Sequence, residues 1–135
     1  MNLNLTDEQS AIAEMARKFA VNKLAPVAAR LDLGESREAD RSIFLENLRG
    51  LAALGFMGMN VKAEYGGSEI GTVAFSLAIT EIARACAATA VTMSVTNMVA
   101  EVIQTVASEE QKQAYLSKLC SGEYPAGGFC LSETG

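Results

Sequence analysis

Residues Thr72 to Val106, TVAFSLAITEIARACAATAVTMSVTNMVAEVIQTV, form the stretch that decides the fold of this 135-residue chain. Apolar and small residues fall on every side of the helical wheel here, and a helix of that kind is buried by its neighbours. Its charged residues are Glu81, Arg84 and Glu101. The uncharged run 85–100 is shorter than the roughly 18 to 20 residues that indicate a membrane span. We therefore expect two buried helices that break near Ala87 to Ala90.

The segments on either side of this pair have the pattern of amphipathic helices. Thr6 to Gln9 and Ser108 to Gln111 both have the form of a capping box, which predicts a helix start at each. Apolar residues then recur at helical spacing at Ile12, Met15, Ala16 and Phe19. Pro26 ends or kinks this first helix, because the residue before a proline disfavours helical angles. A short helix from Pro26 to about Leu31 is expected to follow.

The middle of the chain holds one more helix and a glycine-rich loop. We expect a charged, solvated connection at Asp32 to Arg41 and a helix from about Ala39 to Leu54. The next segment, FMGMNV at Phe56 to Val61, is predicted to be short and extended. Gly66 and Gly67 then make KAEYGGSEIG a loop, because glycine allows backbone angles that side chains forbid.

The chain changes character near its end. Pro125, Gly127 and Gly128 interrupt the helical pattern, and Phe129 to Ser132 alternates like the start of a β-strand. The sequence thus predicts an all-α fold: an orthogonal or up-down bundle of about five to six helices around a buried central pair. This bundle ends in the first residues of a β-strand, which divides the chain at 1–125 and 126–135.

Composition excludes several classes of function. The net charge of −5 argues against nucleic acid and against an anionic membrane surface, because both need a basic face. Histidine is absent and no CxxC motif exists, which excludes a zinc site and any nucleophile paired with histidine. The three cysteines are expected to be free thiols in a reducing compartment. The N-terminus shows no secretory signal.

Few residues carry chemistry by themselves. Glu81 and Arg84 are spaced for an ion pair on one helix face. Glu101, in an apolar helix, is either a general base with a raised pKa or a residue that has a partner or lies at the helix edge. Met93 and Met98 indicate either core or a pocket for a flexible acyl chain. The residues alone therefore support a helical domain, with no catalytic residue and no metal ligand identified.

The order of several segments resembles the acyl-CoA dehydrogenases. The matching segments are LTDEQ (5–9), the run from Ala16 to Pro26, LAALGFMGMNV (51–61), AEYGG (63–67), ASEEQKQAYLSKLCSGE (107–123) and FCLSETG (129–135). Their order and spacing cover nearly the whole chain. The loop departs from the family's pattern, since Lys62 replaces a proline and Glu69 a glycine.

The resemblance implies a helical N-terminal domain at 1–125 and the start of a β-barrel domain at 126–135. The family's enzymes bind FAD and oxidise acyl-CoA thioesters to trans-2-enoyl-CoA. Their catalytic glutamate lies in a C-terminal helical domain, so no catalytic residue is expected here. We expect a fragment truncated mid-motif at Gly135 and inactive alone. The complete protein is expected to be a homo-oligomer that uses acyl-CoA and an electron-transfer flavoprotein as partners.

The resemblance also implies two groups of site residues. The backbone at Phe129 and Leu131 and the hydroxyl of Ser132 are expected to contact the flavin ring, in a segment that includes Cys130. The acyl chain is expected along one helix face, made of Val91, Ser94, Val95 and Met98 at i, i+3, i+4 and i+7. The alternative is that this face is plain core. The small Ser94 would leave room for a medium or branched chain.

Two further alternatives stay open. The chain could be a stand-alone helical interaction module derived from this domain, which binds a protein partner without catalysis. A flavin-dependent oxidase or monooxygenase of the same fold would also fit the residues. The expected location is the bacterial cytoplasm, or alternatively the mitochondrial matrix.

Overall fold

The computed structural model describes residues 4–34 and 36–132 and confirms an all-α fold. Glu133 to Gly135, the end of the FCLSETG motif, lie outside the described residues. Phe129 to Ser132 pairs with no strand within the described part of the chain. The helices, in chain order, are α1 (Asp7–Phe19), a π-helical segment (Ala20–Leu24), α2 (Ala25–Leu33), α3 (Arg37–Ala53), a 3₁₀ turn (Ala63–Tyr65), α4 (Gly71–Ala85), α5 (Ala87–Val106) and α6 (Glu109–Ser121).

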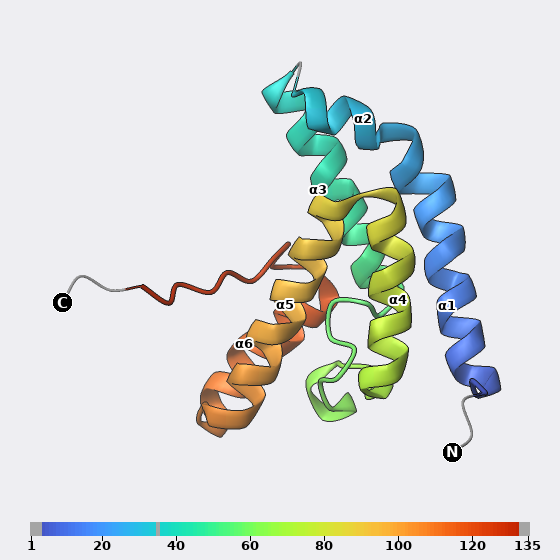
Figure 1. Cartoon of the computed structure of the whole chain (residues 1–135). Coiled ribbons are helices and arrows are strands. Elements are labelled where there is room, and N and C mark those ends of the chain that lie inside the picture. The colour runs from blue at the N-terminus through green and yellow to red at the C-terminus, as the bar shows by residue number, and fades with distance from the viewer. Residues whose placement is uncertain (1–3, 35, 133–135) are drawn as a thin grey trace.

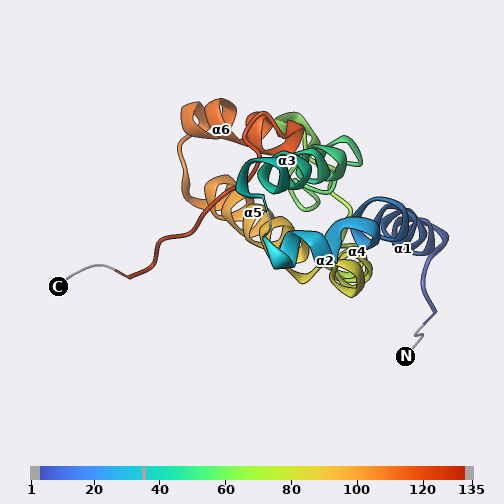
Figure 2. The same cartoon turned by 90° about the horizontal axis from the view of Figure 1, so that it is seen from above.

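The predicted central pair is α4 and α5, and α1, α3 and α6 pack against it (Figure 1). The expectation that the pair is buried on every side was wrong for α5, because Val91, Met98 and Val106 are exposed. α1 packs along α4, whereas α3 and α6 lie against the other side of α5 (Figures 1 and 2). The buried apolar side chains of the pair are Ala74, Ala78, Ile82, Ala90, Met93 and Ala100. None of the described helices is long and apolar enough to cross a membrane.

The helix boundaries follow the local signals in the sequence. Both capping boxes form: the amide of Gln9 donates to Thr6 Oγ1 over 3.1 Å, and that of Gln111 to Ser108 Oγ over 3.3 Å. The central break falls at Cys86, whose extended backbone (φ −154°, ψ 105°) separates α4 from α5. This is one residue before the predicted range. The chain bends between α1 and α2, and Pro26 lies in the first turn of α2 after the π-helical segment (Figure 1). The predicted reason was wrong, because Ala25 before the proline keeps helical angles (φ −54°, ψ −41°).

The charged connection is shorter than expected. α2 and α3 extend into it, so that only residues 34–36 link them. Asp40 is buried and not solvated: it accepts hydrogen bonds from Arg30 Nε (3.1 Å) and from the backbone amide of Ser36 (2.9 Å). The expectation of a solvated linker was wrong at this point, because the carboxylate satisfies a free amide at the start of α3 and pairs with α2.

Phe56 to Val61 is also not extended. The segment runs through successive turns between the helices, with four of its side chains buried: Phe56, Met57, Met59 and Val61. Turns leave backbone groups unpaired, and unpaired buried groups are costly. Asn97 of α5 satisfies two of them, since its Oδ1 accepts from the Met59 amide (2.8 Å) and its Nδ2 donates to the Phe56 carbonyl (2.9 Å).

One buried carboxylate ties α1 to the central pair. Glu81 of α4 accepts two hydrogen bonds from Arg17 of α1, at Nε (3.0 Å) and Nη2 (3.1 Å). The expected ion pair with Arg84 is confirmed at 3.5 Å. The Arg17 guanidinium holds the pKa of Glu81 below its ordinary value of 4.5, although burial acts in the opposite direction.

We predict that Asn97→Ala destabilises the chain by about 3 kcal/mol, because it leaves a buried amide and a buried carbonyl without partners. Urea unfolding followed by circular dichroism measures the change. Thr105→Ala removes an exposed side-chain bond on the same helix and should change stability by less than about 0.5 kcal/mol. Equal effects of the two substitutions would contradict the role given to Asn97.

We also predict that Glu81→Gln lowers the melting temperature at neutral pH by on the order of 3 °C. A depressed pKa contributes stability that is fully present above about pH 4.5 and is lost as the pH falls through the folded-state pKa. The difference between the two proteins should therefore shrink at acid pH, as measured by thermal unfolding from about pH 7 to pH 3. Glu14→Gln, in an exposed pair with Lys18, is the control and should show no measurable shift.

Candidate functional site

α5 presents two different faces along its length. The inner face packs into the bundle through Thr89, Ala90, Met93, Thr96, Asn97 and Ala100. The four predicted acyl-contacting residues lie on the opposite face, where Val91 is 62% and Met98 42% exposed. Ser94 and Val95 between them are half-buried. This face is therefore not plain core within the described chain, and Met98 is separated from Met93, which is fully buried.

The outward face continues beyond Met98 to Val102 and Val106, both exposed. These six residues are apolar apart from the Ser94 hydroxyl, the exposed Thr105 lies beside the last of them, and none of the six is titratable. A face of this kind cannot carry acid–base chemistry. It can form one wall of an apolar pocket or an interface, which is the usual meaning of a contiguous exposed apolar surface.

The second predicted group lies in the segment that follows α6. The chain passes α5 near the middle of the helix and then runs away from the bundle (Figures 1 and 2). Phe129 is 51% and Leu131 80% exposed, and Cys130 and Ser132 are also exposed. No backbone or side-chain group of Phe129 to Ser132 makes a hydrogen bond to the described part of the chain. These groups are therefore available to an outside partner.

The predicted acyl-contacting face and this segment meet on the same helix. The backbone amide of Gly127 donates to Thr96 Oγ1 over 3.1 Å, and Gly127 lies against the side chain of Val99. Thr96 and Val99 adjoin Val95 and Met98 in the sequence. α5 thus supports both predicted groups, although the structure gives no direct contact between their side chains within the described residues.

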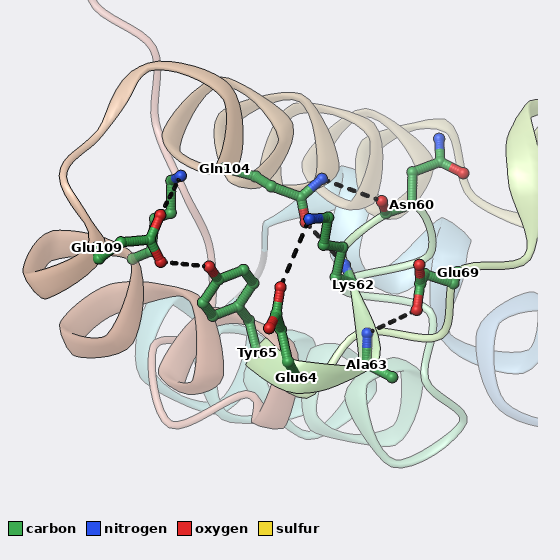
Figure 3. A network of polar contacts seen from close by, with 9 residues as sticks. Asn60, Lys62, Ala63, Glu64, Tyr65, Glu69, Gln104 and Glu109 are labelled. Carbon is green, nitrogen blue, oxygen red and sulfur yellow. Dashed lines mark hydrogen bonds and ion pairs between the residues drawn. The ribbon is translucent and has the colours of Figure 1, made fainter.

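A polar network around Tyr65 holds the glycine-rich loop against α5 and α6 (Figure 3). The Tyr65 hydroxyl donates to Glu109 Oε2 over 2.6 Å, and the Lys62 amide donates to Gln104 Oε1 over 2.7 Å. The Glu109 carboxylate raises the pKa of Tyr65 to about 12. Glu69, which replaces the family's glycine, accepts from the amide of Ala63 over 2.9 Å. These bonds pair polar groups of the loop with other groups of the described chain, so we interpret the loop as a structural connection between α5 and α6.

Glu101 has a partner as well. Its Oε1 accepts from Asn60 Nδ2 over 2.7 Å, which confirms the interpretation in which the carboxylate has a hydrogen-bond partner. A cavity of about 710 Å³ lies between α2, α3 and the junction of α4 and α5. Its lining contains neither the outward face of α5 nor the segment after α6. The structure therefore does not place the predicted site residues in this cavity.

Sequence reasoning missed the residues that support the site. Asn97 could have been found, because an amide in the most apolar helix of a chain must have hydrogen-bond partners. Thr96 and Glu109 gave no signal, since threonine on a helix and glutamate in a first helical turn are ordinary. Their roles depend on segments that are distant in the sequence.

Comparison with known proteins identifies the family. Residues 6–123 match the family "Acyl-CoA dehydrogenase, N-terminal domain". The chain is 36% identical over 134 residues to the short-chain specific acyl-CoA dehydrogenase of Clostridium acetobutylicum, and the match covers 98% of this chain and 34% of that protein. The chain thus spans about a third of the length of the curated relatives it matches.

Solved structures give the same result. A chain in the structure of the electron transferring flavoprotein of Acidaminococcus fermentans matches with a TM-score of 0.77 and 30% identity, over 90% of this chain and 31% of that one. The acyl-CoA dehydrogenase of Bacillus anthracis, complexed with FAD, matches with a TM-score of 0.77 and 28% identity, over 89% of this chain and 20% of that one. The chain therefore belongs to the acyl-CoA dehydrogenase N-terminal domain family.

Proposed function

We propose that this chain is the N-terminal helical part of an FAD-dependent acyl-CoA dehydrogenase, which converts acyl-CoA thioesters to trans-2-enoyl-CoA. The observation that carries the proposal is the outward face of α5, an apolar surface without titratable groups in a chain of this family. Residues 1–125 form the helical domain, and 126–135 begin the next domain.

The role of the α5 face is to bind and orient the acyl chain. Val91, Ser94, Val95 and Met98 form one wall of the acyl pocket, and the opposite wall comes from outside residues 1–135. Burial of methylene groups against this wall would contribute about 0.8 kcal/mol each. The face excludes water from the chain but supplies no proton acceptor. We infer from the resemblance to the family, in line with the lack of a titratable group on this face, that the base that removes the α-proton lies outside residues 1–135.

The segment after α6 fits the edge of a flavin ring. Its exposed backbone at Phe129 and Leu131 has donors and acceptors that are unpaired among the described residues, and the Ser132 hydroxyl can donate to a flavin acceptor. Cys130 lies between them with its thiol exposed. FAD, when bound, would accept the hydride that leaves the β-carbon. The chain's own contribution is to hold the ring and orient it toward the acyl wall.

We infer the partners from the same relatives. Acyl-CoA is the substrate and an electron-transfer flavoprotein is the electron acceptor, in line with the flavoprotein structure that the chain resembles. The complete protein is proposed to be a homo-oligomer. Bacterial and mitochondrial relatives both match, which leaves the bacterial cytoplasm and the mitochondrial matrix as the two proposed locations.

An interaction module is the second candidate function, because the exposed face of α5 would also suit a protein partner. The experiment that separates the two candidates uses the complete protein encoded by the reading frame that contains residues 1–135. The dehydrogenase is expected to carry FAD, visible in its absorption spectrum, and to reduce an electron-accepting dye with acyl-CoA substrates. A protein without flavin and without turnover on short, medium and branched acyl-CoAs would refute the enzyme proposal.

We predict that Ser94→Leu in the complete protein reduces kcat/KM for medium-chain acyl-CoA by at least about tenfold, because the larger side chain fills the acyl pocket. The effect on the shortest substrates should be smaller, and FAD content should not change. Steady-state kinetics over a series of chain lengths measure the effect. Ser76→Leu, the same substitution on an exposed position of α4, is the matched control and should leave the chain-length profile intact. A uniform loss over all chain lengths would speak against an acyl-facing Ser94.

A further inference from the structure

Thr96 is a fully buried threonine whose hydroxyl makes two hydrogen bonds. It donates to the carbonyl of Thr92 over 2.7 Å, one turn earlier in α5, and it accepts from the backbone amide of Gly127 over 3.1 Å. A hydroxyl has one proton and two lone pairs, so both bonds form at once. The first bond fixes the rotation of the hydroxyl, which leaves a lone pair for Gly127.

Gly127 fits this place because it has no side chain. A Cβ atom built at this position would lie 3.0 Å from Cβ and 3.2 Å from Cγ1 of Val99, which is tighter than ordinary van der Waals contact. The close approach brings the Gly127 amide within reach of Thr96. Thr96 and Val99 together therefore determine where the chain crosses α5.

The chain before this crossing is held separately. The Tyr124 amide donates to the Lys118 carbonyl over 3.0 Å, and the Lys118 ammonium lies 5.4 Å from the centre of the Tyr124 ring. After the crossing, Phe129 to Ser132 makes no hydrogen bond within the described residues. Gly127 is thus the last fixed point before this segment, and Phe129 follows two residues later, within about 7 Å along the chain.

We propose that Thr96 is a positioning residue: its hydroxyl fixes the start of the flavin-contacting segment Phe129 to Ser132 relative to the acyl wall on α5. This inference rests on the proposed function. Because Thr96 lies between Val95 and Asn97, the same turn of α5 contributes to the acyl wall, anchors the segment and binds the buried loop. One rigid helix thereby sets the distance between the acyl chain and the flavin edge.

Thr96→Val tests the anchor, because valine has the same shape but cannot accept a hydrogen bond. In the 135-residue chain, hydrogen exchange by NMR should show the Gly127 amide exchanging roughly tenfold faster, while the core amides of α5 are unchanged. Thr96→Ser keeps the hydroxyl and should restore protection. Thr92→Val removes a matching bond to the Ala88 carbonyl without touching the segment, and is the matched control. Unchanged exchange at Gly127 in Thr96→Val would overturn the proposal.

The close packing of Gly127 on Val99 provides an independent test of how the segment is positioned. Gly127→Ala should also raise exchange at residue 127, because the new methyl group meets Val99. The double variant Gly127→Ala/Val99→Ala removes that contact and should restore protection. A lack of rescue in the double variant would overturn the view that close packing on Val99 positions the segment.

The functional readout is FAD affinity in the complete protein. Thr96→Val should raise the FAD dissociation constant about tenfold, whereas Thr96→Ser and Thr92→Val leave it unchanged. If the unsubstituted protein binds FAD and Thr96→Val binds it equally well, the positioning role is overturned and the proposed function stands. If the unsubstituted protein binds no FAD, the proposed function fails, and the positioning role fails with it.

Discussion

The amide side chain of Asn97 supplies hydrogen bonds to backbone groups of the segment from Phe56 to Val61, which forms no helix of its own. The chain between α3 and α4 crosses the interior in turns, and turns leave backbone amides and carbonyls without partners. Asn97 binds the backbone at Met59 and Phe56, and Gln104, two turns along α5, binds the Lys62 amide. Side chains of α5 therefore make the hydrogen bonds that the backbone of this segment cannot make within itself. This explains why the otherwise largely apolar inner face of α5 carries the amide of Asn97.

The position of this crossing determines the position of α6. Gly58 has no room for a side chain beside Cys120 of α6, so the loop and the helix meet in close contact. The Tyr65 hydroxyl adds a bond to the first turn of α6 through Glu109. Burial raises the pKa of the Cys120 thiol to about 11, which keeps it protonated and unreactive. These contacts fix the position of α6 and therefore also the point from which the segment toward Phe129 begins.

The two faces of α5 differ in their surroundings: the inner face packs into the bundle, and the outward face is exposed. Charged side chains join helices in the pairs of Glu81 with Arg17 and Asp40 with Arg30. The six residues of the outward face of α5 carry no charge. Under the proposed function, a domain built in this way would contribute shape and register to a catalytic site, and the reacting groups would come from outside it. This agrees with the absence of any candidate base on the outward face, where the six side chains carry no titratable group.

Local signals in the sequence determined much of the fold. The capping boxes at Thr6 and Ser108 depend on neighbouring residues and were predicted correctly. The burial of the central pair was predicted correctly only for its inner faces, because the outward face of α5 is exposed. The resemblance to the family also singled out Val91, Ser94, Val95 and Met98 as one face. Only the tertiary structure decided that this face is turned outward, that Phe56 to Val61 folds into turns, and that Thr96 binds Gly127. Helix starts depend on bonds within a few residues, whereas these features depend on bonds and packing between segments about 30 to 40 residues apart.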